Sequence, residues 1–272
     1  MRHAAFALIV MIVAGAVRAT AQTGPQPTIA LTIGAGVVTG HALWNIDRQP
    51  LCVLNQSNGS CSGLYDTLAL SRSIASSVTL GLAATYFPWP RLGFHAEFSY
   101  LGFPTDDGCI GRFFNPDPPD ERAQQMCNNL AAATGTGGAI TLFVGVTARA
   151  APRRSISPYI RANVGIINLS GSTTEVVGRY VNASGAVERQ IVEDLRPGGT
   201  SAMFGGAAGL TTPIGSGYQF RFELRDMISP LDRLTGPAND LAVAPHASRL
   251  YHHFALILGL DIVLEKKRGR RY

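Results

Sequence analysis

Charged side chains alternate with apolar ones in several segments of this chain, and these are the residues best suited to chemistry. Successive side chains of a β-strand point to opposite faces, so residues two apart share a face. In the segments 92–103 and 218–228 this pattern places charged groups opposite a row of large apolar residues. Across the chain, the candidate set is His95, Glu97, Arg161, Arg221, Glu223, Arg225 and Asp261, and Arg149 lies on the same predicted face.

If the strands that carry them enclose these residues, the carboxylates and guanidiniums are expected to pair with one another. A desolvated charge without a partner is very costly, which is the reason for this expectation. We favour the interpretation that the pairs form a polar plug. A gated conduit or small-ligand pocket, in which one arginine–glutamate pair exchanges partners, is the alternative. We expect no bound cofactor and no metal.

The elements that position these residues are predicted to be β-strands. The last of them, 254–264, has a large apolar residue at every even position, whereas Gly259 and Asp261 lie on the other face. In a soluble sandwich the apolar face would cover a core, but in a membrane barrel it faces lipid and the mixed face lines the lumen. Alternation and turn signals predict eight strands, at about 28–44, 66–87, 92–103, 134–149, 156–170, 200–212, 218–228 and 249–265.

The connections between these strands favour the membrane barrel. The turns at 88–91, 151–154 and 213–217 are short, whereas the connections at 45–65, 104–133, 171–199 and 229–248 are long. Short and long connections alternate strictly, as they do in outer-membrane barrels with short periplasmic turns and long external loops. We therefore predict an all-β fold, an eight-stranded antiparallel up-and-down transmembrane barrel. Its domain spans 22–265, with a polar, filled lumen.

Both ends of the chain carry signals of export and location. A positive start, an apolar run and a small-residue site at 19–21 predict a cleaved signal peptide over 1–21. The run is too short for a spanning helix, and no other apolar stretch is longer. The formal net charge of +5 is concentrated in a basic tail, 266–272, which we place in the periplasm. This local basicity does not indicate a nucleic-acid-binding protein.

Four cysteines in an exported chain are plausible disulfide partners. Cys52 and Cys61 fall in the first long connection, and Cys109 and Cys127 fall in the second. Four cysteines allow three pairings, of which we favour the local one, within each connection. A metal site would need tighter ligand clusters, and the sequence has none.

A search for catalytic groups favours a protein that is not an enzyme. His246, Ser248, His252 and His253 lie near the outer end of the last strand, where a lipid-modifying hydrolase would place them. No strained Gly-x-Ser-x-Gly turn accompanies them. The segment 34–40 departs from the dinucleotide fingerprint in its last interval. Carboxylates in 106–121 match no EF-hand loop and are predicted to be solvated.

The pattern as a whole resembles the small OmpA-type and OmpX-type outer-membrane barrels over about 28–265. In that family the last strand carries an assembly signal, which Gly259, Ile262 and Leu264 would supply here, with aliphatic residues in place of aromatic ones. The resemblance implies a monomer that contacts outer-membrane lipid, lipopolysaccharide and the barrel-assembly machinery. It also implies a structural or surface-interaction role, or a narrow channel. A soluble lipocalin-like binder is a further alternative, since such barrels also have eight strands.

Overall fold

The structure is a computed structural model that describes most of the chain between residues 27 and 265. The described ranges are 27–54, 61–112, 121–132, 134–135, 137–152, 154–182, 185–192, 198–238 and 244–265. The predicted signal peptide over 1–21 and the basic tail over 266–272 lie outside these ranges and remain predictions. Within the described residues, no helix has both the length and the apolar character needed to cross a membrane.

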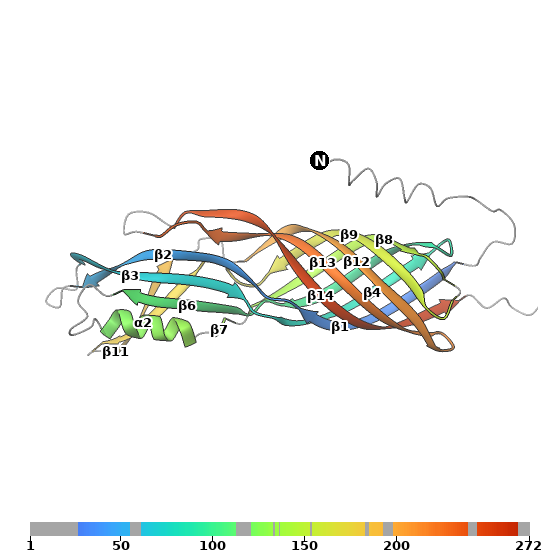
Figure 1. Cartoon of the computed structure of the whole chain (residues 1–272), viewed down its shortest axis with the longest axis horizontal. Helices are drawn as coiled ribbons and strands as arrows, with labels where there is room; N and C mark the ends of the chain where they lie inside the picture. Colours follow the sequence, from blue (N-terminus) through green and yellow to red (C-terminus); the bar gives the residue numbers. More distant parts are fainter. Residues whose placement is uncertain are drawn as a thin grey trace, which may run out of the picture.

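Eight antiparallel strands close into a barrel, as the sequence predicts (Figure 1). Each strand pairs with its neighbours along the chain, and β1 closes the ring by pairing with both β14 and β4. The short turns lie at one end, next to the start of β1 and the end of β14. The barrel strands are β1 (Thr28–Val38), β4 (Ser77–Phe87), β5 (Leu92–Gly102), β8 (Gly138–Arg149), β9 (Ser157–Leu169), β12 (Gly199–Gly215), β13 (Tyr218–Leu234) and β14 (His246–Glu265).

The outer surface of the barrel is an apolar belt. Leu82 on β4 is 57 % exposed, and Val144 on β8 and Leu258 on β14 are also exposed. Large apolar residues of this kind occur on the outward face of all eight barrel strands. A continuous apolar surface of this extent is not tolerated in water. The belt therefore faces lipid, and the barrel spans a membrane.

Beyond one end of the barrel the long connections build a second layer of regular structure. A sheet is formed by β2 (His41–Leu54), β3 (Cys61–Ile74), β6 (Thr105–Arg112) and the short β7 (Thr134–Gly135). Helix α2 (Glu121–Ala132) and the hairpin of β10 (Val176–Asn182) with β11 (Gly185–Val192) lie at the same end (Figure 1). We call this assembly, together with the outer parts of β13 and β14, the external domain.

The external domain departs from the sequence prediction at the strand ends. The strand predicted at 28–44 is β1 followed by the start of β2, and the strand predicted at 66–87 is the end of β3 followed by β4. The segments predicted as long loops contain strands and a helix. Alternation continues across the bends, so periodicity could not show where the barrel ends. Bulges in the β2–β3 pairing, such as that between Ile46 and Gln49, further disturb the pattern.

Three side-chain contacts tie the parts of the external domain together. The indole Nε1 of Trp44 donates to the carbonyl of Thr173 at 2.9 Å. The amide of Gln49 both donates to the carbonyl and accepts from the N–H of Ala238, each at 2.9 Å, as a neighbouring strand would. The phenol of Tyr251 donates to the carbonyl of Leu43 at 2.7 Å. These contacts surround an apolar core that includes Leu68, Leu70, Met126, Leu130 and Leu231.

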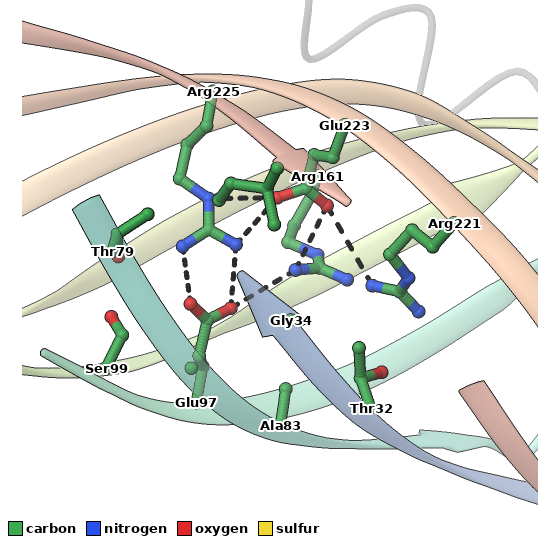
Figure 2. A pocket seen from close by; sticks show the side chains of 12 residues that line it. Thr32, Gly34, Thr79, Ala83, Glu97, Ser99, Arg161, Arg221, Glu223 and Arg225 are labelled. Atoms are coloured by element: carbon green, nitrogen blue, oxygen red, sulfur yellow. Dashed lines mark hydrogen bonds and ion pairs between the residues drawn. The ribbon is translucent and has the colours of Figure 1, made fainter. Parts of the chain in front are cut away.

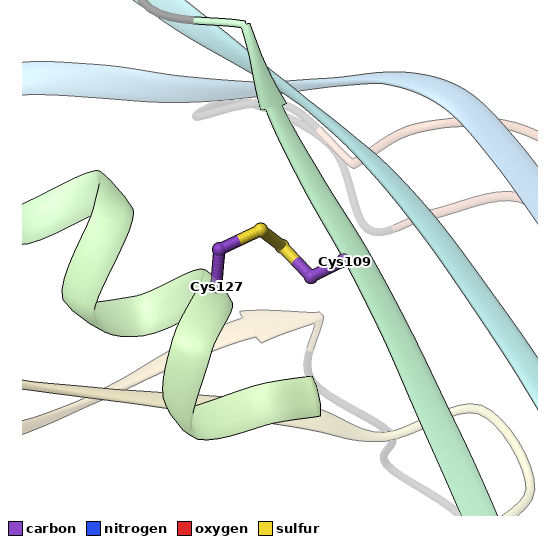
Figure 3. The surroundings of a disulfide bond; sticks show 2 residues. All are labelled: Cys109 and Cys127. Atoms are coloured by element: carbon purple, nitrogen blue, oxygen red, sulfur yellow. A yellow bond between two sulfur atoms is a disulfide. The ribbon is translucent and has the colours of Figure 1, made fainter. Parts of the chain in front are cut away.

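A disulfide joins Cys109 on β6 to Cys127 on α2 (Figure 3), which is the pairing the sequence analysis favours for the second connection. The side chains of Cys52 and Cys61 lie outside the described residues, so their pairing remains a prediction. Nearby, Asp107 accepts two hydrogen bonds from the guanidinium of Arg72, at 2.6 and 2.8 Å. The expectation that this carboxylate is merely solvated is therefore wrong.

Candidate functional site: the lumen charge network

The lumen charge network is assembled from four barrel strands whose odd-numbered residues point inward. β5 contributes His95 and Glu97, β9 contributes Arg161, β13 contributes three residues and β14 contributes Asp261. All of the side chains in the predicted set are buried, whereas the even-numbered residues between them face the lipid. The set as the structure places it is His95, Glu97, Arg161, Arg221, Glu223, Arg225 and Asp261. Figure 2 shows the two glutamates and the three arginines of this set.

Arg225 joins the two glutamates of the network. Its Nη2 donates to Glu97 at 2.9 Å, and a second bond runs from Nη1 to the other oxygen of the same carboxylate. Its Nε and Nη2 also donate to Glu223, at 2.9 and 2.6 Å. The strands β5 and β13 are four places apart in the ring of eight, so the contact between Glu97 and Arg225 crosses the lumen. One guanidinium thus holds opposite walls of the barrel together.

Arg161 and Tyr159 add further contacts to the same carboxylates. Nη1 of Arg161 lies 3.3 Å from Glu97 Oε2 and 3.3 Å from Glu223 Oε2. The phenol of Tyr159 donates to Glu223 Oε2 at 2.6 Å. The Nε of Arg161 also donates to the hydroxyl of Thr147, at 3.3 Å. The network therefore reaches all the way from β5 through β8 and β9 to β13.

Arg221 completes the network on the side of β14. Its Nη2 and Nε donate to Asp261 Oδ2 at 2.8 and 3.2 Å, and Thr32 on β1 donates to the other oxygen of that carboxylate at 2.8 Å. Arg221 also lies 3.8 Å from Glu223. Asp261 thus links the last strand to the first, where the barrel closes.

Two further residues that face the lumen have no ionic partner among the described residues. Both ring nitrogens of His95 are buried without a hydrogen bond. The guanidinium of Arg149 lies over the ring of Phe87, 3.2 Å from its centroid. Arginine stacking on an aromatic face is favourable. His95 is near the arginines but is bonded to none of them, so the structure brings six of the seven predicted residues into one ionic network.

Tyr159, Thr32 and Thr147 take part in the network but are absent from the predicted set. The alternation of faces along a strand could have identified Tyr159, because it lies two residues before Arg161 on the inward face of β9. Thr32 and Thr147 are short polar residues on inward positions, and such residues are common on any mixed strand face. Nothing in the sequence alone distinguishes them.

The external half of the lumen is filled by apolar side chains. Ile167, Met203 and Met227 lie toward the external ends of their strands, and Phe143 lies at the middle of β8, where it pairs with Glu97. All four side chains are buried. Beside the charge network, a cavity of about 20 Å³ lies against Gly34, Gly81 and Ala83 together with the network residues. Such a volume holds about one water molecule. The packed layer and the network together leave this part of the lumen filled.

The histidines of β14 do not converge on Ser248. His252 faces outward and its Nδ1 lies 2.8 Å from Asp226, whereas His253 faces inward and bonds to the hydroxyl of Ser229 at 2.9 Å. His246 and Ser248 are exposed further along the strand. The described residues contain no cluster of three or more histidine, cysteine or acidic side chains that could hold a metal ion.

The residues of the predicted assembly signal lie at the periplasmic half of β14. Gly259 pairs with Gly34 of β1 and with Arg221 of β13. Leu264 is exposed on the lipid-facing side, and Ile262 is half-buried. Recognition of these residues by the assembly machinery remains a prediction.

Comparison with known proteins returns similar folds only. No protein-family model and no curated protein matches the sequence. Among solved structures, the outer membrane protein OprG from Pseudomonas aeruginosa has 9 % identity and a TM-score of 0.45, over 89 % of this chain and 98 % of that one. Neisserial surface protein A has 9 % identity and a TM-score of 0.42, over 86 % and 96 %. The outer membrane protease OmpT from Escherichia coli has 8 % identity and a TM-score of 0.36, over 91 % and 99 %.

Proposed function

We propose that this eight-stranded outer-membrane β-barrel is a non-enzymatic anchor whose closed lumen supports a domain displayed at the cell surface for contact with other molecules. One observation carries the proposal. Six charged side chains of the lumen pair with one another across the barrel, while the external connections form a cored and cross-linked domain. The barrel thus supplies rigidity, and the external domain supplies the surface available to a partner.

The pairing of the network supports a lumen that does not conduct. An ion that crosses the barrel must pass Arg225, which is bonded to Glu97 and Glu223 and is buried with them. Breaking a buried ion pair costs roughly 3–5 kcal/mol, because it leaves an uncompensated charge. The apolar layer around Phe143 adds a second obstacle, since an ion there has no polar ligand.

The construction of the external domain supports a role in surface contact. Its core is buried, its helix is joined to its sheet by a disulfide, and Gln49 and Trp44 bond to neighbouring connections. A pre-organised surface loses less conformational entropy when it binds a partner than a mobile loop does. Mobile loops would be sufficient if the barrel served only as a pore.

Conductance of the purified protein in planar bilayers tests the closed lumen. We expect no stable single-channel steps from the folded protein, whose state is verified by its mobility before and after boiling. Reproducible steps that change in Arg225→Gln would contradict the proposal and would favour the narrow conduit instead.

Labelling of intact cells tests the display of the external domain. We expect a membrane-impermeant maleimide to label Asp47→Cys, because Asp47 is exposed in the external domain. Arg154→Cys is the matched control, because Arg154 is exposed in the turn between β8 and β9 at the opposite end of the barrel. Protection of Asp47→Cys together with labelling of Arg154→Cys would reverse the proposed orientation.

A further inference from the structure

The wall of the molecule has a seam between β2 and β14, just outside the barrel. The pairing of β1 with β14 ends at Val38 and Ala255, and the last main-chain bond runs from Thr39 N to Phe254 O at 2.8 Å. Beyond this point β14 pairs with β13 and β2 pairs with β3, but in the described residues the two do not pair with each other. Side chains alone therefore hold the two edges together.

The sheet on one side of the seam is attached to the barrel along a common bend. Its order, β2-β3-β6-β7, repeats the barrel order β1-β4-β5-β8. The strands are interrupted at 39–40, 75–76 and 103–104, all at the junction with the barrel. In Figure 1, β2, β3 and β6 continue from one side of the barrel, whereas β13 and β14 extend from the other. Short breaks at element ends are the places where a hinge absorbs changes in backbone angle.

A cluster of rings closes the seam next to this bend. His41 at the start of β2 stacks on Tyr251 and lies against His253, with 5.0 Å between ring centroids in each case. Phe103 meets His253 edge-on at 5.3 Å. The other side of His253 bonds to Ser229 through Nε2. Four segments of the chain therefore meet at two imidazole rings.

Burial favours the neutral form of both imidazoles. Burial lowers the pKa of His41, whose two ring nitrogens are buried without a hydrogen-bond partner. Burial, followed by the nearby His41 and His252, lowers the pKa of His253, which lies on the external side of the last β1–β14 pair. The guanidinium of Arg249 lies over the ring of Tyr251 in the same cluster, 5.9 Å from its centroid. The carboxylate of Asp226 is bonded to His252 on the opposite face of the hairpin.

We propose that this seam is an acid-sensitive closure, in which mild acid separates His41 from His253 and the edges of β2 and β14 part next to the bend. At neutral pH the stacked neutral rings and the hydrogen bond from Tyr251 to the carbonyl of Leu43 keep the edges together. When either ring takes up a proton, solvation of the new charge favours the separated state. The inference concerns the external domain alone and holds whether or not the lumen conducts.

The direction and size of the effect follow from linkage. Once the seam is open, both histidines have pKa values near the unperturbed value of about 6.5. The open state therefore binds more protons than the closed state below that pH, so acid favours opening. Between pH 7.5 and 5.5 each histidine shifts the open-to-closed ratio by up to about tenfold, and the pair by up to about a hundredfold. Above pH 7.5 both histidines are neutral in the open and in the closed state, so the open-to-closed ratio no longer changes with pH.

Trp44 is a suitable reporter for the experiment. It is buried near the seam, three positions from His41, and the only other tryptophan of the chain is Trp89. In the full-length protein with Trp89→Phe, quenching of Trp44 fluorescence by acrylamide is measured at pH 7.5 and 5.5 in detergent micelles. We expect quenching to rise several-fold at pH 5.5 and to fall back to its initial value when the pH is restored to 7.5. His41→Phe and His253→Gln should each reduce the rise, and the double variant should abolish it.

His246→Gln is the matched control, because His246 is exposed on the same strand. It should retain the full rise. Quenching that does not change with pH in the parent would overturn the proposal, as would a rise that persists in the double variant. If the double variant does not show the heat-dependent mobility of a folded barrel, the proposal is tested on the two single variants. An undiminished rise in both of them would overturn the proposal as well.

Discussion

Glu223 connects to four neighbours in the lumen. It accepts hydrogen bonds from Tyr159 and Arg225 and lies within salt-bridge distance of Arg161 and Arg221. It is completely buried. A carboxylate in this position stabilises the folded barrel less by its own attraction than by compensating the guanidiniums around it. Its loss would leave those charges buried without a partner.

Replacing Glu223 with glutamine should therefore destabilise the barrel strongly. We expect Glu223→Gln to lower the free energy of unfolding by roughly 3–5 kcal/mol, because the side chain keeps its size but loses its charge. Urea unfolding in detergent, followed by tryptophan fluorescence, measures the change. Asp47→Asn, at an exposed position of the external domain, should stay within about 0.5 kcal/mol of the parent. Equal effects of the two substitutions would show that the network does not stabilise the fold.

Parity on each strand identified the charged residues of the lumen, but not their partners. Glu97 and Arg225 both fall on inward positions, and the sequence analysis expects them to pair with some opposite charge. Which pairs form depends on the register between strands that are distant in the chain. The sequence of a single strand does not show this register. His95 falls on the same strand face as Glu97, which predicts that it belongs to the ionic set, yet it is not bonded to an ionic partner.

At the scale of the strand, small residues allow neighbouring backbones and side chains to approach closely. An ideal Cβ at Gly165 on β9 would lie 1.9 Å from the carbonyl oxygen of Leu142 and 2.8 Å from the ring of Phe143. At Gly206 on β12 it would meet nothing within 4 Å. Both glycines lie in the barrel wall, but only Gly165 is closely packed. A glycine in a strand interior often marks such a close approach.

Alanine at these two positions should have contrasting effects. We expect Gly165→Ala to cost roughly 1–3 kcal/mol, because β8 must move to admit the methyl group. Gly206→Ala should leave stability unchanged or slightly higher, since alanine reduces the freedom of the unfolded chain. The temperature at which each variant loses its compact mobility in SDS compares them. Loss of stability in Gly206→Ala alone would contradict the described packing.

The disulfide of the external domain joins a helix to the edge of a sheet. Cys109 and Cys127 are separated by 18 residues, and Met126 and Leu130 of α2 pack into the same core. We expect Cys109→Ser/Cys127→Ser to destabilise the docking of α2 by roughly 2–4 kcal/mol. Faster proteolysis within 105–135, with the mobility shift of the barrel unchanged, is the expected readout. A variant that loses the mobility shift as well would show that the two layers unfold as one unit.

At the scale of the whole molecule, a band of exposed apolar residues separates the parts that face lipid from those that face water. Leu82, at the middle of β4, lies inside the band. Leu250 is equally apolar and 60 % exposed, but it lies on the part of β14 that pairs only with β13, beyond the barrel. Exposure alone does not distinguish the two residues, whereas their positions relative to the barrel do.

Substitution by arginine should show which of the two positions faces lipid and which faces water. We expect Leu82→Arg to lower the stability of the barrel in lipid vesicles by roughly 2–4 kcal/mol, the cost of a cation near the bilayer midplane. Leu250→Arg should change it by less than about 0.5 kcal/mol. Urea titration of vesicle-inserted protein measures both values. If Leu250→Arg were the more costly substitution, the band would have to extend outward over the hairpin.

The number of barrel strands and their order could be predicted from the sequence, because lipid and lumen impose opposite polarity on alternate residues. Strand 218–234 shows this clearly, with Phe220, Phe222 and Leu224 against Arg221 and Glu223. The external domain could not be predicted in the same way. Its strands have one polar face and one buried face, as many soluble sheets do, and its bends at 39–40 and 75–76 leave the alternation of the flanking segments intact.

The lumen network also constrains the route by which the chain enters its membrane. Glu97 and Arg225 are 128 residues apart, and Arg221 and Asp261 are 40 apart, so a chain with only its first strands formed contains none of these pairs. An open, partly inserted sheet would present its guanidiniums and carboxylates to hydrocarbon. Such an intermediate is too costly to accumulate. Curling of the sheet and passage into the bilayer should therefore be a single concerted event, with the charges neutralised before the hydrocarbon surrounds them.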